Sequence, residues 1–187
     1  MKFLVSAAGT GGHVFPAVEF SQECIAQDHE VIWLGTKTGI ENRVVPKNNI
    51  ELITIPMSGF RGKSPLIKIK SLLGLLISIL KSIYLILKYK INFVMCFGGY
   101  VSLPVGLAAW ICRKPLFLHE QNTVIGTSNK ILLRFAKNIF LGFPVNSIQE
   151  KNMILVGNPI KNRTKRKSSF KDTRPLRIYV TGGSQGS

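Results

Sequence analysis

The sequence is poor in acidic residues, with nine Asp and Glu against 25 Lys and Arg, and its formal net charge is +16. Such an excess makes nucleic acid and anionic membranes the partners to consider. Many of the basic residues lie in residues 161–177, where Phe170 is the one aromatic residue. This run lacks the aromatic interleaving of a single-strand platform, so we interpret it as a solvated segment and expect no nucleic-acid partner.

Cysteine is scarce as well. The three cysteines, Cys24, Cys96 and Cys112, lie in apolar surroundings without CxxC spacing. This usage predicts reduced, buried thiols in a cytoplasmic protein, and no metal site is visible. The apolar start at residues 1–5 meets glycines too soon to form a signal peptide, so we expect a first buried strand there.

Two common nucleotide-binding patterns are missing. A dinucleotide fingerprint needs GxGxxG and an acidic residue after the second strand. Here Val14 stands at the third glycine position, and no carboxylate follows Leu34 directly. No Gly-Lys-Ser/Thr stands at the P-loop spacing after Gly9 either. Both absences disfavour NAD chemistry and ATP hydrolysis.

What the sequence does contain is a series of short apolar runs separated by helical stretches. Runs without alternation are typical of strands buried on both faces. They predict an α/β fold, a Rossmann-like parallel sheet with helices on both faces. The expected strands are 3–5, 31–34, 52–55, 93–96, 116–118, 138–141 and 153–156, and the expected helices are 16–27, 66–89, 103–112 and 128–136.

The domain organisation follows from where this periodicity stops. Residues 1–158 form the expected domain, and residues 159–176 are a basic linker rich in charge. Residues 177–187 restart a strand and a glycine loop. We interpret them as the first strand of a second, truncated Rossmann-like domain.

Glycine-rich or polar loops follow three of the expected strands. They are residues 9–12, residues 97–102 and residues 119–122. A strand that runs into glycines brings backbone N–H groups close to a phosphate. In an open parallel sheet, ligands bind where such loops gather. We therefore expect a site for a phosphate-bearing ligand, although any one of these loops could be only a tight turn.

His13 follows the first glycine loop, where a helix begins. The positive end of the helix disfavours a protonated imidazole, so His13 is a candidate general base. The alternative is a histidine that caps or packs at the turn. For His119, at the start of the polar loop, we expect a structural hydrogen bond.

Six motifs together carry a resemblance to a known family. They lie in residues 9–17, 35–41, 97–102, 119–122, 157–160 and 182–186. In these motifs the chain resembles the family 28 glycosyltransferases of the GT-B type, the bacterial enzymes that complete lipid II for peptidoglycan synthesis. The resemblance covers the whole chain but only the N-terminal half of such an enzyme.

This resemblance implies an inverting transferase without metal or cofactor. It would move GlcNAc from UDP-GlcNAc to undecaprenyl-diphospho-MurNAc-pentapeptide (lipid I), at the cytoplasmic face of the cell membrane. The N-terminal half would bind lipid I and be inactive alone. A non-catalytic module that binds lipid or phosphate remains the alternative.

The resemblance also implies roles for individual residues. His13 is the candidate base that deprotonates the acceptor hydroxyl. Lys161 stands where the family places an arginine, which keeps the charge but loses a bidentate contact. Whether Arg163 substitutes is open. The implied UDP-GlcNAc contacts are Thr10, Gly11, Gly12, Asn122, Lys161 and Ser184, and the implied acceptor-diphosphate contacts are Gly9, Gly98, Gly99, Tyr100 and Ser102.

The apolar stretch 72–87 is interrupted by Lys81 and is too short to span a bilayer. On a helical wheel, a basic stripe with serines beside it lies opposite a leucine-rich side. This pattern predicts a helix that lies on an anionic membrane surface, with an ordinary covering helix as the alternative. The expected membrane contacts are Lys70, Leu73, Leu76, Leu80, Lys81 and Lys88.

Overall fold

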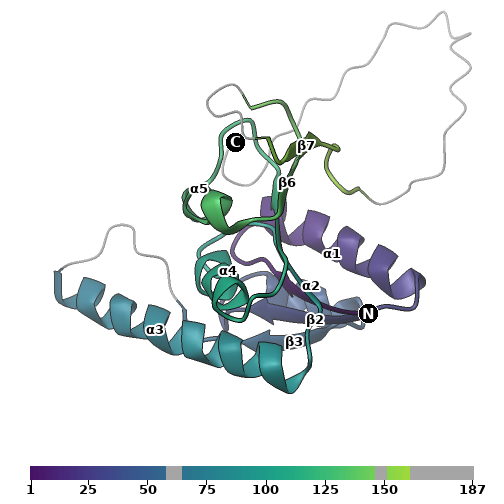
Figure 1. Cartoon of the computed structure of the whole chain (residues 1–187). Helices are drawn as coiled ribbons and strands as arrows, with labels where there is room; N and C mark the ends of the chain where they lie inside the picture. Colours follow the sequence, from purple (N-terminus) through teal and green to yellow (C-terminus); the bar gives the residue numbers. More distant parts are fainter. Residues whose placement is uncertain (58–64, 146–150, 161–187) are drawn as a thin grey trace, which may run out of the picture.

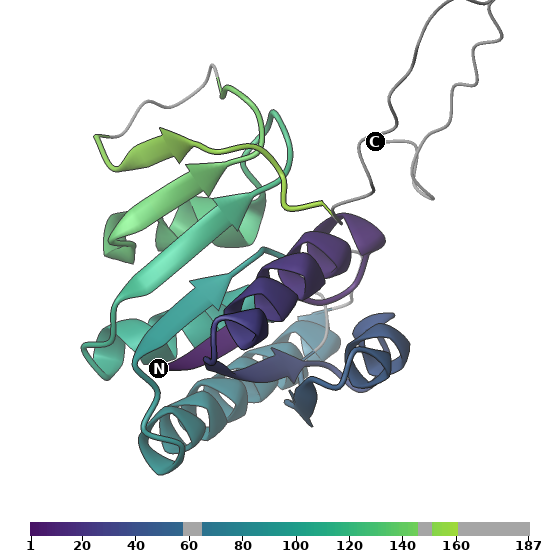
Figure 2. The same ribbon diagram turned by 90° about the vertical axis from the view of Figure 1, so that its right-hand side faces the viewer.

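The computed structural model describes residues 1–57, 65–145 and 151–160, and side chains are described for all of these except residues 65–71. Its centre is a seven-stranded sheet in the order β3-β2-β1-β4-β5-β6-β7, with every neighbouring pair parallel (Figure 2). The predicted Rossmann-like parallel sheet is confirmed. The strands are β1 Lys2–Ser6, β2 Glu30–Gly35, β3 Glu51–Thr54, β4 Phe93–Cys96, β5 Leu116–Glu120, β6 Asn138–Leu141 and β7 Met153–Leu155.

Helices cover both faces of this sheet (Figures 1 and 2). Helices α3, α4 and α5 pack together on one face, whereas α1 and α2 lie on the other. Each face has its own apolar core, because successive strand residues point to opposite sides. The helices are α1 Gly11–Ala26, α2 Glu41–Lys47, α3 Pro65–Lys88, α4 Ser102–Ile111 and α5 Thr127–Leu132, which continues into a 3-10 turn at Leu133–Phe135.

The strand order reverses between β1 and β4, which lie side by side at the middle of the sheet. The chain leaves β1 toward α1 on one face and leaves β4 toward α4 on the opposite face. Ligands of open α/β sheets bind at such a reversal, outside the carboxyl ends of the strands. The glycine loops at residues 9–12 and 97–102 follow these two strands.

Three local predictions are corrected. Helix α1 begins at Gly11 instead of residue 16, because Thr10 takes the extended N-cap conformation (φ −102°, ψ 159°). Pro16 therefore lies inside the helix. Helix α2 was not predicted. Strand β5 runs through Glu120, so His119 belongs to a strand and not to the loop after it.

The domain boundaries remain a proposal, because the basic linker beyond Ile160 and residues 177–187 lie outside the described residues. The three cysteines are free; Cys24 and Cys96 are buried and Cys112 is half-buried. Burial raises the pKa of Cys96 to about 12 and that of Cys24 to about 11. These two thiols therefore stay protonated near neutral pH, which makes them poor nucleophiles.

Candidate functional site

The loops after β1 and β4 lie directly against each other. Phe97 N–H donates to Ser6 O at 2.8 Å. A Cβ atom built at Gly99 would lie only 2.6 Å from Ala8 O, and Gly98 and Gly99 have φ values of +95° and +76°. Both the close approach and the positive φ require glycine at position 99. The glycines therefore let two loops from different halves of the sheet meet at the site.

Ser102 holds the second loop from inside. It is fully buried, and its hydroxyl lies 2.7 Å from Gly98 O and 3.3 Å from Ser6 O, while Gly98 N–H donates to it at 3.1 Å. A hydroxyl engaged in this way has no surface to offer a diphosphate. Ser102 thus shapes the Gly98 loop, and its expected contact with a diphosphate stays a prediction.

Glu41 plays a similar part for the first loop. Its buried carboxylate accepts hydrogen bonds from Gly9 N–H at 3.2 Å, Thr36 N–H at 3.0 Å and Thr36 Oγ1–H at 2.8 Å. The Gly9 N–H is thus directed at Glu41. The first N–H groups of a helix lack intrahelical partners, so those of Gly11 and Gly12 stay available to a ligand.

Glu120, at the end of β5, organises the polar loop that follows. Its two carboxylate oxygens accept four hydrogen bonds, from Asn122 N–H and Nδ2 at 3.1 Å each, from Gly126 N–H at 2.9 Å and from Asn129 Nδ2 at 3.0 Å. The residue is 1% exposed. One buried carboxylate thereby fixes the path of residues 122–129 and the start of α5.

His13 lies in the first turn of α1, directly after the first glycine loop. Its Nδ1 lies 2.7 Å from Gln121 Oε1. A Cβ atom at Gly98 would lie 3.0 Å from His13 Cε1, so the glycine gives the imidazole the space that it occupies. The ring therefore bridges the first glycine loop, the second glycine loop and the end of β5.

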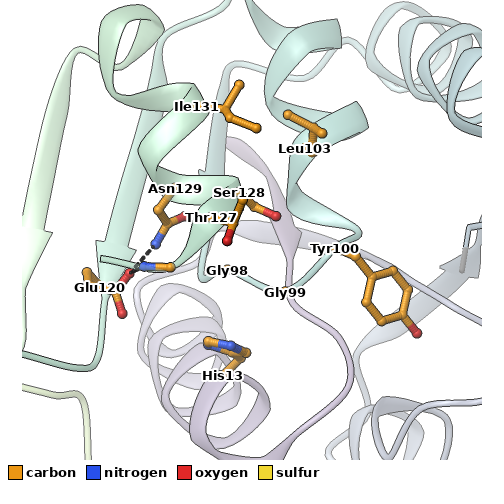
Figure 3. A pocket seen from close by; sticks show the side chains of 11 residues that line it. His13, Gly98, Gly99, Tyr100, Leu103, Glu120, Thr127, Ser128, Asn129 and Ile131 are labelled. Atoms are coloured by element: carbon orange, nitrogen blue, oxygen red, sulfur yellow. Dashed lines mark hydrogen bonds between the residues drawn. The ribbon is translucent and has the colours of Figure 1, made fainter. Parts of the chain in front are cut away.

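A cavity of about 450 Å³ opens at this junction (Figure 3). Glycine backbone and His13 form one side of it, and the start of α5 forms the other. Among the described residues that line it, one is acidic and none is Lys or Arg. The lining residues are His13, Gly98, Gly99, Tyr100, Leu103, Glu120, Gly126, Thr127, Ser128, Asn129 and Ile131.

The structure brings together only part of the expected site. His13, Gly98, Gly99 and Tyr100 line the cavity. Thr10, Gly11 and Gly12 lie beside it at the start of α1, and Asn122 is exposed with its amide held by Glu120. Lys161 and Ser184 lie outside the described residues.

Sequence reasoning missed the wall that α5 provides. Thr127 and Ser128 place hydroxyls at the cavity, and Asn129 is 1% exposed with an Oδ1 atom that lacks a hydrogen-bond partner among the described residues. A buried acceptor without a partner suits a ligand N–H or O–H group. The sequence signal was Gly126 followed by two hydroxyl residues, a typical helix start.

The two sides of helix α3 differ in burial. Its serine side packs against the protein, with Ser78 and Ser82 fully buried, and Ser82 Oγ donates to Ser78 O at 2.7 Å. The opposite, apolar side is open to solvent. We call it the α3 outer face; it consists of Leu72, Leu73, Leu76, Ile77, Leu80, Tyr84 and Leu87, each at least 54% exposed.

Two of the expected membrane-contacting lysines border this α3 outer face. Lys81 Nζ bends back to donate to Thr54 O at 2.8 Å. Lys88 is exposed and lies over the rings of Tyr84 and Tyr89, with 5.6 Å and 5.4 Å from Nζ to the ring centroids. The structure does not describe the side chain of Lys70. None of the described helices is long and apolar enough to cross a bilayer, and no cluster of metal-ligating side chains occurs among the described residues.

The parallel sheet, its central reversal and the glycine loops define a Rossmann-like domain of the GT-B type. The chain belongs to glycosyltransferase family 28, whose N-terminal domain model matches residues 3–141. The fold alone is shared more widely: UDP-GlcNAc 2-epimerase from Neisseria meningitidis, solved with bound UDP-GlcNAc, superposes with a TM-score of 0.63 at 15% identity, over 85% of this chain and 47% of that one.

Curated relatives that match the whole chain at about 40% identity share one protein name. The chain is 40% identical, over its whole length, to 53% of the Coxiella burnetii (strain RSA 493) UDP-N-acetylglucosamine–N-acetylmuramyl-(pentapeptide) pyrophosphoryl-undecaprenol N-acetylglucosamine transferase. It is 39% identical to 54% of the enzyme of that name from Haemophilus ducreyi. The crystal structure of Acinetobacter baumannii MurG matches with a TM-score of 0.75 and 36% identity, over 86% of this chain and 46% of that one. The chain thus spans about half the length of the curated relatives that it matches.

Proposed function

We propose that this chain is the acceptor-binding half of an inverting transferase that moves GlcNAc from UDP-GlcNAc to lipid I. The observation that carries the proposal is His13, held by Gln121 in the wall of a cavity between two glycine loops. The name of the relatives, which cover the whole chain at about 40% identity, supports the same reaction.

In this proposal the acceptor sugar enters the cavity with its hydroxyl near His13. The N–H groups of Gly99 and Tyr100, and the N-terminal N–H groups of α1, provide donors for phosphate oxygens. His13 takes the hydroxyl proton as the oxygen attacks the anomeric carbon of GlcNAc. The bond from that carbon to the phosphate breaks, UDP leaves with the electron pair, and the configuration inverts.

The described lining of the cavity also bears on where the UDP part of the donor binds. UDP leaves as an anion, and its departure requires positive charge or hydrogen-bond donors at the phosphates. The described lining offers the Glu120 carboxylate and no Lys or Arg. We therefore assign donor binding mainly to a C-terminal domain, with Thr10, Gly11, Gly12 and Asn122 on this side, and Lys161 and Ser184 beyond the described residues.

A reconstitution assay tests the transferase. The chain alone should show no transfer from radiolabelled UDP-GlcNAc to a lipid I analogue, whereas the chain joined to the C-terminal half of Acinetobacter baumannii MurG should make product. Lipid I binding by the chain alone, together with a folded but inactive fusion, would instead favour a non-catalytic lipid- or phosphate-binding module.

We further propose that the α3 outer face lies on the anionic, cytoplasmic side of the cell membrane, where a lipid-linked acceptor is found. Seven large apolar side chains exposed on one side of a helix are costly in water but favourable in the interfacial region of a bilayer. Each lysine near such a surface adds about 1 kcal/mol. The proposed contacts are Lys70, Leu73, Leu76, Leu80, Lys81 and Lys88.

Replacing Leu76 and Leu80 together by aspartate should weaken binding to phosphatidylglycerol vesicles about 10²- to 10⁴-fold, because each leucine contributes roughly 1.5–3 kcal/mol when buried. Vesicle sedimentation measures the change. Val124→Asp, at an even more exposed apolar residue outside α3, is the control and should bind as the wild type does. Equal binding by the double variant would remove α3 from the membrane interface.

A further inference from the structure

A continuous chain of hydrogen bonds connects His13 with the backbone of Gly157. His13 Nδ1 lies 2.7 Å from Gln121 Oε1, Gln121 Nε2 lies 2.9 Å from His119 Nδ1, and His119 Nε2 lies 3.1 Å from Gly157 O. The four residues come from α1, the loop after β5, β5 itself and the segment after β7. This series of hydrogen bonds, here called the relay, therefore runs from the cavity to the segment where the polypeptide leaves the sheet after β7.

The donor and the acceptor of each hydrogen bond can be assigned by starting from Gly157, the last residue of the series. A carbonyl oxygen only accepts, so His119 Nε2 carries the proton that Gly157 O receives. His119 is 2% exposed, and this burial lowers the pKa of its imidazole despite the opposing effects of Gly157 O and Glu120. A neutral imidazole protonated at Nε2 has a free lone pair at Nδ1. His119 Nδ1 must then accept from Gln121.

A second contact fixes the orientation of the Gln121 amide independently. Its Nε2 also donates to His119 O at 3.0 Å, and that backbone carbonyl again only accepts. The amide nitrogen therefore faces His119, and the amide oxygen faces His13. An amide oxygen accepts, so His13 Nδ1 must be the protonated nitrogen. Neutral His13 is left with its lone pair on Nε2.

We infer that Gln121 and His119 are positioning residues that hold His13 as the Nδ1–H tautomer and leave Nε2 free to take the acceptor proton. The inference deepens the proposed function, on which the base role of His13 rests. Among the described residues, no hydrogen bond occupies His13 Nε2.

The surroundings keep this relay in one geometry. The Phe97 ring stacks on His119 at 5.2 Å between centroids and 26° between planes. Asn158 Nδ2 donates to Gln121 O at 3.2 Å, so residues 157 and 158 hold two successive members of the relay. Gly157 has a φ of +82°, which suits glycine. The position of the segment that leads out of the sheet thus bears on the protonation pattern of His13.

Nitrogen NMR of the full 187-residue chain tests the tautomer directly. With only three histidines, ¹⁵N-labelled imidazoles can be assigned by single substitutions. We expect His13 to be protonated at Nδ1 in the wild type, and a wild-type His13 protonated at Nε2 would overturn the inference without any variant. Gln121→Leu should shift His13 toward the other tautomer. His119→Asn, whose Oδ1 can still accept from Gln121, should preserve the wild-type pattern.

Kinetics of the fusion with the Acinetobacter baumannii MurG C-terminal half give the second readout. Gln121→Leu should lower kcat about 10- to 100-fold, which is less than the whole rate enhancement that a general base provides. The KM for UDP-GlcNAc should change little. His29→Asn, at a histidine far from the cavity that stacks on Phe3, is the matched control.

The two proposals can fail separately. A Gln121→Leu chain that stays folded, with an unchanged His13 tautomer and unchanged kcat, overturns the relay even if His13 proves essential. A shifted tautomer together with full turnover by His13→Ala supports the relay and rejects the base role of His13.

Discussion

Replacing His13, the proposed base, by alanine in the fusion with a C-terminal half should lower kcat about 10²- to 10⁴-fold while the KM for UDP-GlcNAc stays within a small factor. The size of the loss is that of a positioned general base. A base acts on the transition state, so its removal affects turnover far more than substrate binding. Steady-state GlcNAc transfer by the fusion with a C-terminal half measures both constants.

The controls for His13→Ala separate chemistry from folding. His13 is half-buried at the start of α1, so its truncation leaves the apolar cores unchanged. The thermal midpoint of the variant should therefore stay close to that of the wild type. His29→Ala should transfer GlcNAc at the wild-type rate. Unchanged turnover by a folded His13→Ala protein would assign His13 to packing at the turn, the alternative that the sequence left open.

Substituting Gly99 by alanine should destabilise the fold by about 2–4 kcal/mol, since it combines two separate costs. A side chain in the left-handed region costs roughly 1–2 kcal/mol. The added Cβ atom would also lie 2.6 Å from Ala8 O, which forces the two loops apart. Urea unfolding followed by circular dichroism measures the change in the free energy of unfolding.

Gly12→Ala is the matched control for this prediction. Gly12 belongs to the other glycine loop, and a Cβ atom there would meet only Thr10 Oγ1 at an ordinary 3.8 Å. It also lies in the first turn of α1, where alanine is the better helix former. Its unfolding free energy should be equal to or above that of the wild type. Equal stability of Gly99→Ala and the wild type would show that the loops do not need their close contact.

The sequence predicted the sheet well, because parallel strands buried on both faces leave a strong local signal. The run at residues 138–141 matches β6, and that at residues 93–96 matches β4. Helix α2 was missed since it is only seven residues long and contains Pro46, a residue that disfavours helix interiors. The start of α1 was placed too late because glycines at 11 and 12 indicate a loop until the extended N-cap at Thr10 is known.

The site was predictable only to the extent that its residues are contiguous. The glycine loops and His13 are local motifs, and a strand followed by glycines and a helix is a typical setting for a bound phosphate. The contact of Ser102 with Ser6 was not foreseen, because the two residues lie 96 positions apart in the sequence. The role of the Glu41 carboxylate depends in the same way on a distant partner, since Gly9 lies 32 residues away. The role of Glu120 in holding the start of α5 was missed although its partners are near in sequence, because the loop conformation that brings Gly126 N–H to the carboxylate is not visible in the residue pattern.

The sequence by itself determined the parallel α/β sheet, the glycine loops, the candidate base and the amphipathic character of α3, because periodicity and glycine placement act over a few neighbouring residues. The tertiary structure alone decided which side of α3 faces solvent, since the small serines let that helix pack closely on the protein and leave the leucines outside. It also decided the relay from Gly157 to His13. Hydrogen bonds between His13 and Gln121, 108 residues apart, arise only when the folded sheet brings the ends of its strands together.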